Sequence, residues 1–256
     1  MSGMWGSKLK ISIFGESHGD AIGITIDGLP SGITIDMQKI KAEMIRRAPN
    51  GELYSTMRKE EDEVQIVSGF FNGKTTGAPL CGLILNENTQ SKDYNRTKDI
   101  MRPSHSDYGY FVKSGGNNDY RGGGHSSGRI TAPLVFCGAI CKQLLAVKGI
   151  QINSHILSIA DIEDKRFDTN ISAEVLEQLS NKTFPLLDSS KESDMIEKIV
   201  DARYVGDSVG GRIECAIVGV EAGVGDPFFD SIESKLSSIL FSVPAVKAVE
   251  FGNGFE

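Results

Sequence analysis

The sequence has no long apolar run, and this shortage argues against a membrane protein. No segment approaches the roughly 18 consecutive apolar residues that a membrane span needs. Residues 1–10 also lack the apolar stretch of a secretory signal, so we expect a cytoplasmic protein without membrane contact. With 256 residues, of which 39% are apolar and 24% charged, the chain can bury a sizeable core, which excludes intrinsic disorder. We expect one domain over residues 1–256.

Cysteine is scarce as well. The four cysteines are scattered, and no two have the C-x-x-C spacing of a metal or redox site. Neither a disulfide framework nor a metal site is therefore expected. Cys137 and Cys141 are four residues apart and share one face if the segment is helical, where the simplest interpretation is two small buried hydrophobes.

Positive charge is in deficit, because the chain has 27 lysines and arginines but 34 aspartates and glutamates, which gives a formal net charge of −7. The deficit is uneven: residues 1–150 carry a net charge of +3 and residues 151–256 a net charge of −10. An acidic chain is a poor nucleic-acid binder, so no nucleic-acid partner is expected. Arginines in the first part suit a small anionic ligand, because a guanidinium group binds phosphate or carboxylate in bidentate geometry.

Short strands and helices alternate along the chain. Apolar alternation predicts strands at 22–26, 64–67, 79–85, 213–217 and 246–251. Helical spacing predicts helices at 37–47, 130–147, 195–200 and 232–240, with caps at Asp36, Ser189 and Asp230. Pro133 is expected to kink the second helix or to delay its start. The polar, glycine-rich segment 86–124 is predicted to be a functional loop.

Two histidines lie in short polar motifs. Ser17 and His18 stand between Gly15 and Gly19, directly before a predicted strand. A Ser–His hydrolase pair is a weak interpretation, because adjacent residues in extended backbone point to opposite sides, and a histidine hydrogen-bonded in a tight turn is the alternative. His105 stands two residues before Asp107, which allows a metal ligand, a general acid oriented by the carboxylate, or an ordinary loop histidine.

The most informative stretch runs from Arg121 to Arg129 and contains three consecutive glycines. Glycine lets the backbone approach a ligand closely, and Ser126 and Ser127 can cap the helix that follows. The free N–H groups of a helix start attract an anion, so the stretch predicts phosphate or carboxylate binding. It matches neither a P-loop nor a dinucleotide fingerprint. The mixed charges at 46–47 and 58–62 are most simply a solvated helix end and loop.

Taken in order, these segments resemble the chorismate synthase family over essentially the whole chain. The matching segments are Gly15–Gly19 with Asp27–Pro30, Gln90–Tyr94, Arg102–Tyr108, Asp119–Thr131 with Gly138–Ile140, and Pro244–Glu250. The resemblance implies an α+β fold, a sandwich with a helical layer between two antiparallel sheets, although periodicity alone also allows a parallel α/β sheet.

The resemblance also implies an enzyme of the shikimate pathway of aromatic amino acid biosynthesis. Such lyases convert 5-enolpyruvylshikimate 3-phosphate to chorismate and phosphate by 1,4-elimination, and they require reduced FMN although the reaction has no net redox change. It implies a small anionic substrate, a homotetramer, and reduced flavin supplied by a separate flavin reductase, with NADPH as an indirect reductant.

Site residues follow from the resemblance position by position. The catalytic residues would be His18 and His105. The substrate-binding residues would be Ser17, Arg47, Arg58 and Arg129. The cofactor-binding residues would be Arg47, which also matches a nicotinamide-nucleotide contact, and His125, Ser126, Ser127, Pro244 and Ala245.

The chain departs from the family pattern at three places. Leu53 and His125 stand where arginine is common in the family. The family's C-terminal part, with an Arg-His-Asp-Pro signature, has no counterpart here. We therefore expect one incomplete sheet and at best weak activity of residues 1–256 alone. The alternative is a truncated, inactive relative that only binds flavin or phosphate.

Overall fold

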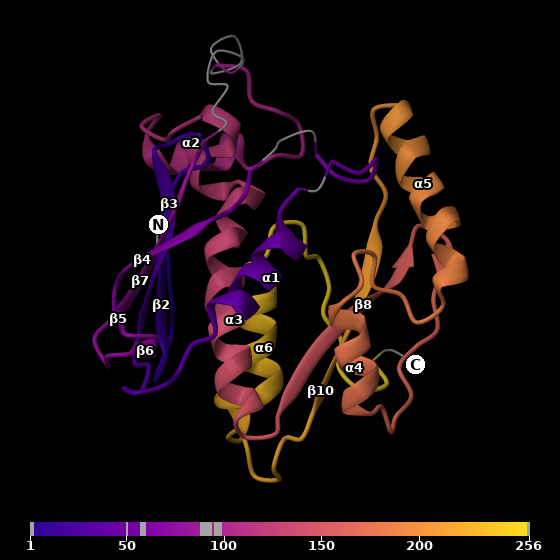
Figure 1. The fold of residues 1–256 in the computed structure, drawn as a ribbon. Coiled ribbons are helices and arrows are strands. Elements are labelled where there is room, and N and C mark those ends of the chain that lie inside the picture. Colours follow the sequence, from indigo (N-terminus) through magenta and orange to yellow (C-terminus); the bar gives the residue numbers. More distant parts are fainter. Residues whose placement is uncertain (1–2, 50, 57–59, 88–93, 95–98, 255–256) are drawn as a thin grey trace. The chain divides into compact units, whose positions relative to one another are not determined.

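The structure is a computed structural model that describes residues 3–49, 51–56, 60–87, 94 and 99–254 (Figure 1). It divides into two compact units, each described separately below. The first unit comprises residues 1–48, 60–140 and 223–256, and the second comprises residues 49–59 and 141–222.

An antiparallel sheet of five strands forms the framework of the first unit. Its order is β1-β2-β3-β7-β4, built from Met4–Gly6, Lys10–Gly15, Ala21–Asp27, Leu80–Leu85 and Val64–Ser68. The small hairpin of β5 (Phe70–Phe71) and β6 (Lys74–Thr75) follows β4. Ile22, Ile24 and Ile26 are fully buried, because alternate residues of a strand point to the same face. The strands predicted at 22–26, 64–67 and 79–85 are confirmed.

Helix α1 (Met37–Arg47) begins as the sequence predicts. The Asp36 carboxylate accepts hydrogen bonds from the backbone N–H groups of residues 38 and 39, at 2.9 and 3.4 Å. The helix buries Ile40 and Met44 and ends ahead of Pro49, which cannot continue a helix. The position of Arg47 at its last turn follows from these two local signals.

A helical run covers the face of this sheet. It consists of η2 (Arg121–Ser126), η3 (Gly128–Thr131) and α3 (Ala132–Ala146), so Pro133 lies in the first turn of α3 and the predicted late start is confirmed. Phe136 is fully buried directly against Gly82 of β7. By length and composition alone the whole run could cross a membrane, but a buried core helix passes the same test.

The second unit has a three-stranded antiparallel sheet of order β10-β8-β9. The strands are Gln151–Ile159 (β8), Ile162–Glu163 (β9) and Gly211–Val218 (β10), and the helical elements are Ala173–Ser180 (α4), Ser189–Lys191 (η4) and Glu192–Tyr204 (α5). His155 of β8 is fully buried, with Nδ1 3.1 Å from Asp164 and Nε2 2.8 Å from Glu214. Both of its ring nitrogens therefore face carboxylates, which accept hydrogen bonds only.

All three sheets of the described residues are antiparallel, so the α+β class is confirmed and the parallel alternative is wrong. Several local predictions are corrected. The predicted loop 86–124 contains α2 (Asp107–Ser114), and 246–251 forms no strand, since no described segment pairs with it. The helical segment that begins at Ser189 is capped by Asp188, not by Ser189. Helix α6 (Ile232–Leu240) is capped by Ser231, and the Asp230 carboxylate pairs with Lys235 instead.

Candidate functional site

A glycine turn at Gly122–Gly124 gathers both histidine motifs in the first unit. Gly122, Gly123 and Gly124 have φ of 60°, 92° and 54°, a region that residues with a Cβ rarely adopt. A Cβ on Gly122 would collide with the ring of His18, and one on Gly123 would lie 3.2 Å from Cε1 of His105. The two rings thus pack on successive residues of one turn, although their motifs are 87 positions apart in the sequence.

His18 is held from several sides at the end of β2. Its Nδ1 lies 3.0 Å from the hydroxyl of Ser17, and its ring meets Tyr94 edge-on, with centroids 5.0 Å apart. The Ser17 hydroxyl, itself fully buried, donates to the carbonyl of Arg121 at 3.3 Å. The sequence argument that these neighbours point apart is wrong, because residues 16–19 form a turn closed by Gly19 N–H on the Glu16 carbonyl. A buried hydroxyl that donates to a carbonyl is not an available nucleophile.

His105 stands just before α2 and contacts a carboxylate held by an arginine. Its Nδ1 lies 2.7 Å from Oδ1 of Asp107. Arg102 donates to the same carboxylate through Nε at 2.7 Å, Nη2 at 2.9 Å and its backbone N–H at 3.2 Å. The Arg102 hydrogen bonds lower the pKa of Asp107 to about 2, and the same contact raises the pKa of Arg102. Of the three interpretations of this motif, the geometry favours a histidine oriented by a carboxylate.

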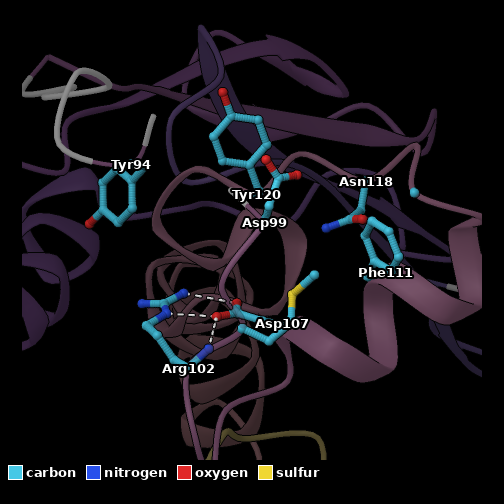
Figure 2. Close-up of a pocket in the computed structure, with 9 residues that line it drawn as sticks. Tyr94, Asp99, Arg102, Asp107, Phe111, Asn118 and Tyr120 are labelled. Atoms are coloured by element: carbon cyan, nitrogen blue, oxygen red, sulfur yellow. Dashed lines mark hydrogen bonds and ion pairs between the residues drawn. The ribbon is translucent and has the colours of Figure 1, made fainter. Parts of the chain in front are cut away.

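A cavity of about 240 Å³ adjoins this group (Figure 2). Most of the side chains that line it are aromatic, charged or amide. The lining residues are Tyr94, Asp99, Met101, Arg102, Asp107, Phe111, Gly116, Asn118 and Tyr120. In Figure 2 the hydrogen-bonded Arg102–Asp107 pair forms one side, with Tyr120 and Asp99 opposite and Asn118 with Phe111 at one end. Aromatic surface beside a few polar groups is typical of a small-molecule site.

Three of the residues predicted to contact flavin, His125, Ser126 and Ser127, lie at the same turn. Ser126 donates to the Gly123 carbonyl at 2.7 Å and lies 2.6 Å from the hydroxyl of Ser106. Ser127 accepts from the N–H of Arg129 at 3.3 Å and so caps η3. His125 Nδ1 lies 2.8 Å from the carbonyl of Gly15. These contacts fix the serines and His125 relative to His18 and His105, and the flavin contact itself stays a prediction.

Glu60 and Asp62 belong to a buried cluster of charges, so the solvated loop that the sequence suggested at 58–62 is wrong for these two residues, and residues 58 and 59 lie outside the described part of the chain. Arg129 is 6% exposed and pairs with Glu60 and Asp62, while Arg47 binds the other oxygen of Asp62 at 2.6 Å. Arg47 also donates to the carbonyl of Gly128 at 3.3 Å. Substrate binding by both arginines remains a prediction, and their observed partners are carboxylates of the protein.

The other predicted positions are more peripheral or cannot be placed. Arg58 lies outside the described residues. Pro244 and Ala245 lie in the exposed stretch after α6, where Ala245 has φ of 69°, a strained value for a residue with a Cβ. Leu53, in the second unit, is 67% exposed. Among the described residues, no three histidine, cysteine or acidic side chains form a group that could hold a metal ion.

The sequence reasoning missed Arg102 as a member of the site and offered Asp107 only in one of three interpretations of the motif. Both stand in the segment Arg102–Tyr108 that carried the family resemblance, but only His105 was assigned a role by that resemblance. The signal was available, because an aspartate two residues from a histidine and an arginine three residues before it can all meet around one helix start.

Comparison with known proteins identifies the family of the chain. A family model described as chorismate synthase matches residues 9–256. Proteins named chorismate synthase from Dehalococcoides mccartyi strain BAV1 and Methanobrevibacter smithii are 42% and 43% identical, and each match covers 100% of this chain and 69% of the relative. A solved structure titled "Crystal Structure of Chorismate Synthase" matches with a TM-score of 0.77 at 27% identity, covering 97% of this chain and 70% of that chain.

Proposed function

The chain belongs to the chorismate synthase family, and from this premise we propose how the residues of the glycine turn serve the family's reaction. The reaction is the conversion of 5-enolpyruvylshikimate 3-phosphate to chorismate and phosphate, and the chain is a lyase of aromatic biosynthesis. The alternative of an inactive relative that only binds flavin or phosphate is not favoured, because relatives that carry the enzyme's name match the whole chain.

We propose that His18 and His105 act as proton donors in the elimination. In this 1,4-elimination the C–O bond to phosphate breaks and its electron pair leaves with the phosphate. A ring C–H bond also breaks, its electrons form the additional double bond, and its proton passes to solvent, which balances the proton that the acid gives. A positioned acid next to the departing phosphate or the cofactor offsets the charge that develops there. The observation that carries the proposal is the packing of both rings on Gly122 and Gly123, beside a cavity with aromatic and charged walls.

Reduced FMN is proposed as the cofactor, and the described residues fit such a group. Tyr94, Phe111 and Tyr120 give the cavity aromatic walls, and Ser126 and Ser127 precede a long helix whose N-terminus favours an anion. When bound, the reduced flavin would supply electron density that helps phosphate to leave. The residues proposed to hold it are Arg47, His125, Ser126, Ser127, Pro244 and Ala245.

Further properties are proposed on the resemblance alone. These are substrate contacts by Ser17, Arg47, Arg58 and Arg129, assembly as a homotetramer, a cytoplasmic location, and reduced flavin from a separate reductase. Arg47 is the better supported of the two visible arginines, because its side chain is 20% exposed against 5% for Arg129. Reduction of the flavin by NADPH stays a prediction.

The test is anaerobic turnover of 5-enolpyruvylshikimate 3-phosphate with dithionite-reduced FMN, followed by both phosphate release and chorismate absorbance. Replacing His18 or His105 with Ala should lower kcat roughly 10²–10⁴-fold, the usual contribution of a positioned acid. Lys113→Ala, an exposed cation on α2, is the control and should retain activity. Wild-type kcat in either histidine variant would remove that residue from the mechanism.

A further inference from the structure

The carboxylate of Asp107 is fully used by its neighbours, which distinguishes it from an ordinary surface aspartate. Oδ1 accepts from Nη2 of Arg102 at 2.9 Å and lies 2.7 Å from Nδ1 of His105. Oδ2 accepts from Nε of Arg102 at 2.7 Å and from its backbone N–H at 3.2 Å. Asp107 is also the first residue of α2, where the helix dipole favours an anion. This occupancy leaves no oxygen free to bind a metal ion, so the metal interpretation of the motif is disfavoured.

The arrangement fixes the hydrogen on one nitrogen of His105. With a pKa of about 2, Asp107 is an anion at any pH at which an enzyme of this kind works, and an ionised carboxylate only accepts hydrogen bonds. Nδ1 of His105 must therefore carry a hydrogen and donate it to Asp107. Nε2 lies 3.5 Å from the position that a Cβ on Gly123 would take, so it lies at the glycine turn.

Arg102 gives this contact its rigidity. Its planar guanidinium forks onto both oxygens of Asp107, which holds the carboxylate plane in one orientation and with it the ring of His105. Gly123 supports the ring from the other side, since its missing Cβ leaves room for Cε1 at 3.2 Å. The imidazole is thus held between a charged pair and a glycine turn.

We propose that Asp107, oriented by Arg102, is a positioning residue that fixes the tautomer and ring orientation of His105, so that Nε2 is the nitrogen that delivers the proton. The proposal rests on the proposed acid role of His105. Neither Asp107 nor Arg102 needs to touch the substrate for this role.

The test compares Asp107→Asn, Arg102→Lys and Asp230→Asn in the same turnover assay. Asp107→Asn should lower kcat roughly 10²-fold, as a misplaced catalytic group does, with little change in KM. Arg102→Lys keeps the charge but not the fork, so its kcat should lie between wild type and Asp107→Asn. Asp230→Asn removes an exposed, paired carboxylate and should leave kcat and KM unchanged.

A double variant separates this proposal from the proposed function. Adding Asp107→Asn to His105→Ala should cost nothing further, because the positioned ring is gone. If His105→Ala alone retains full activity, the acid role itself is wrong. If His105→Ala is impaired but Asp107→Asn has wild-type kcat, only the positioning role is overturned.

A measurement on the unmodified chain covers the case in which a variant fails to fold. Long-range ¹⁵N–¹H correlation of the His105 ring reports which nitrogen carries hydrogen in the neutral form. We expect hydrogen on Nδ1. Hydrogen on Nε2 of the neutral ring would overturn the proposal.

Discussion

Replacing Arg129 by Met tests whether the buried charge cluster is a structural centre of the first unit. The side chain of Arg129 is 5% exposed, and those of Glu60 and Asp62 are 2% and 0% exposed. The guanidinium also donates to Asn86 Oδ1 at 3.1 Å. Met keeps much of the length and apolar stem, so the substitution removes the charge and the donors with a small change in volume.

The magnitude follows from what the change leaves behind. Removing one partner of a buried ion pair costs about 3–5 kcal/mol, because the remaining charge stays buried without compensation. Asp62 would retain Arg47 at 2.6 Å, whereas Glu60 would lose the guanidinium. We therefore expect a loss of about 4 kcal/mol, a large part of the roughly 5–15 kcal/mol that stabilises a typical domain.

The assay is urea unfolding followed by tryptophan fluorescence. The sequence has one tryptophan, Trp5, whose indole N–H donates to Ser238 at 3.0 Å within the first unit. The control is Lys235→Met, which removes the cation of a pair whose side chains are 44% and 59% exposed and should cost less than about 1 kcal/mol.

Two outcomes would refute this reasoning. If Arg129→Met unfolds within about 1 kcal/mol of wild type, the cluster is not the buried centre that the structure shows. If it also loses only substrate affinity, Arg129 is a ligand-binding residue, as the family resemblance implies. Neutralising Glu60 in the same chain, with Gln, should recover part of the lost stability, because the carboxylate that loses the guanidinium is then uncharged while Asp62 keeps Arg47.

Local signals in the sequence were sufficient for the parts of the fold that depend on near neighbours. The alternation Ile22, Ile24, Ile26 has the period of a strand with one buried face, and all three are fully buried. Asp36 caps α1 because a short acceptor directly before a helical pattern reaches the free N–H groups two and three residues on. Pro133 delayed α3 because its ring is compatible with the first turn of a helix but not with its interior.

The site needed contacts that no local pattern encodes. Arg129 pairs with Asp62, which is 67 residues away in the sequence. The ring of His18 packs on Gly122, which is 104 residues away. From the sequence, Asp62 was predicted to lie in a solvated charge cluster, and Gly122 was predicted to lie in a glycine turn that binds a ligand. Only the family resemblance brought His18 and His105 together before the structure did, because it carries three-dimensional information that the spacing of residues in one chain lacks.

Two further changes separate structural from catalytic roles. His155→Leu should destabilise the second unit by about 3 kcal/mol, because it leaves the buried carboxylate of Asp164 without the imidazole ring. Hydrogen exchange of the β8 amides measures this loss, and unchanged protection of these amides would contradict the prediction. Gly122→Ala and Gly32→Ala both place a Cβ at positive φ, 60° and 79°, and each should cost roughly 1–2 kcal/mol. Nothing lies within 4 Å of a Cβ on Gly32, whereas one on Gly122 strikes the ring of His18. Gly122→Ala alone should therefore also lower kcat, by roughly 10²-fold, because the ring must leave its position. Equal kcat in the two alanine variants would show that the glycine turn does not position His18.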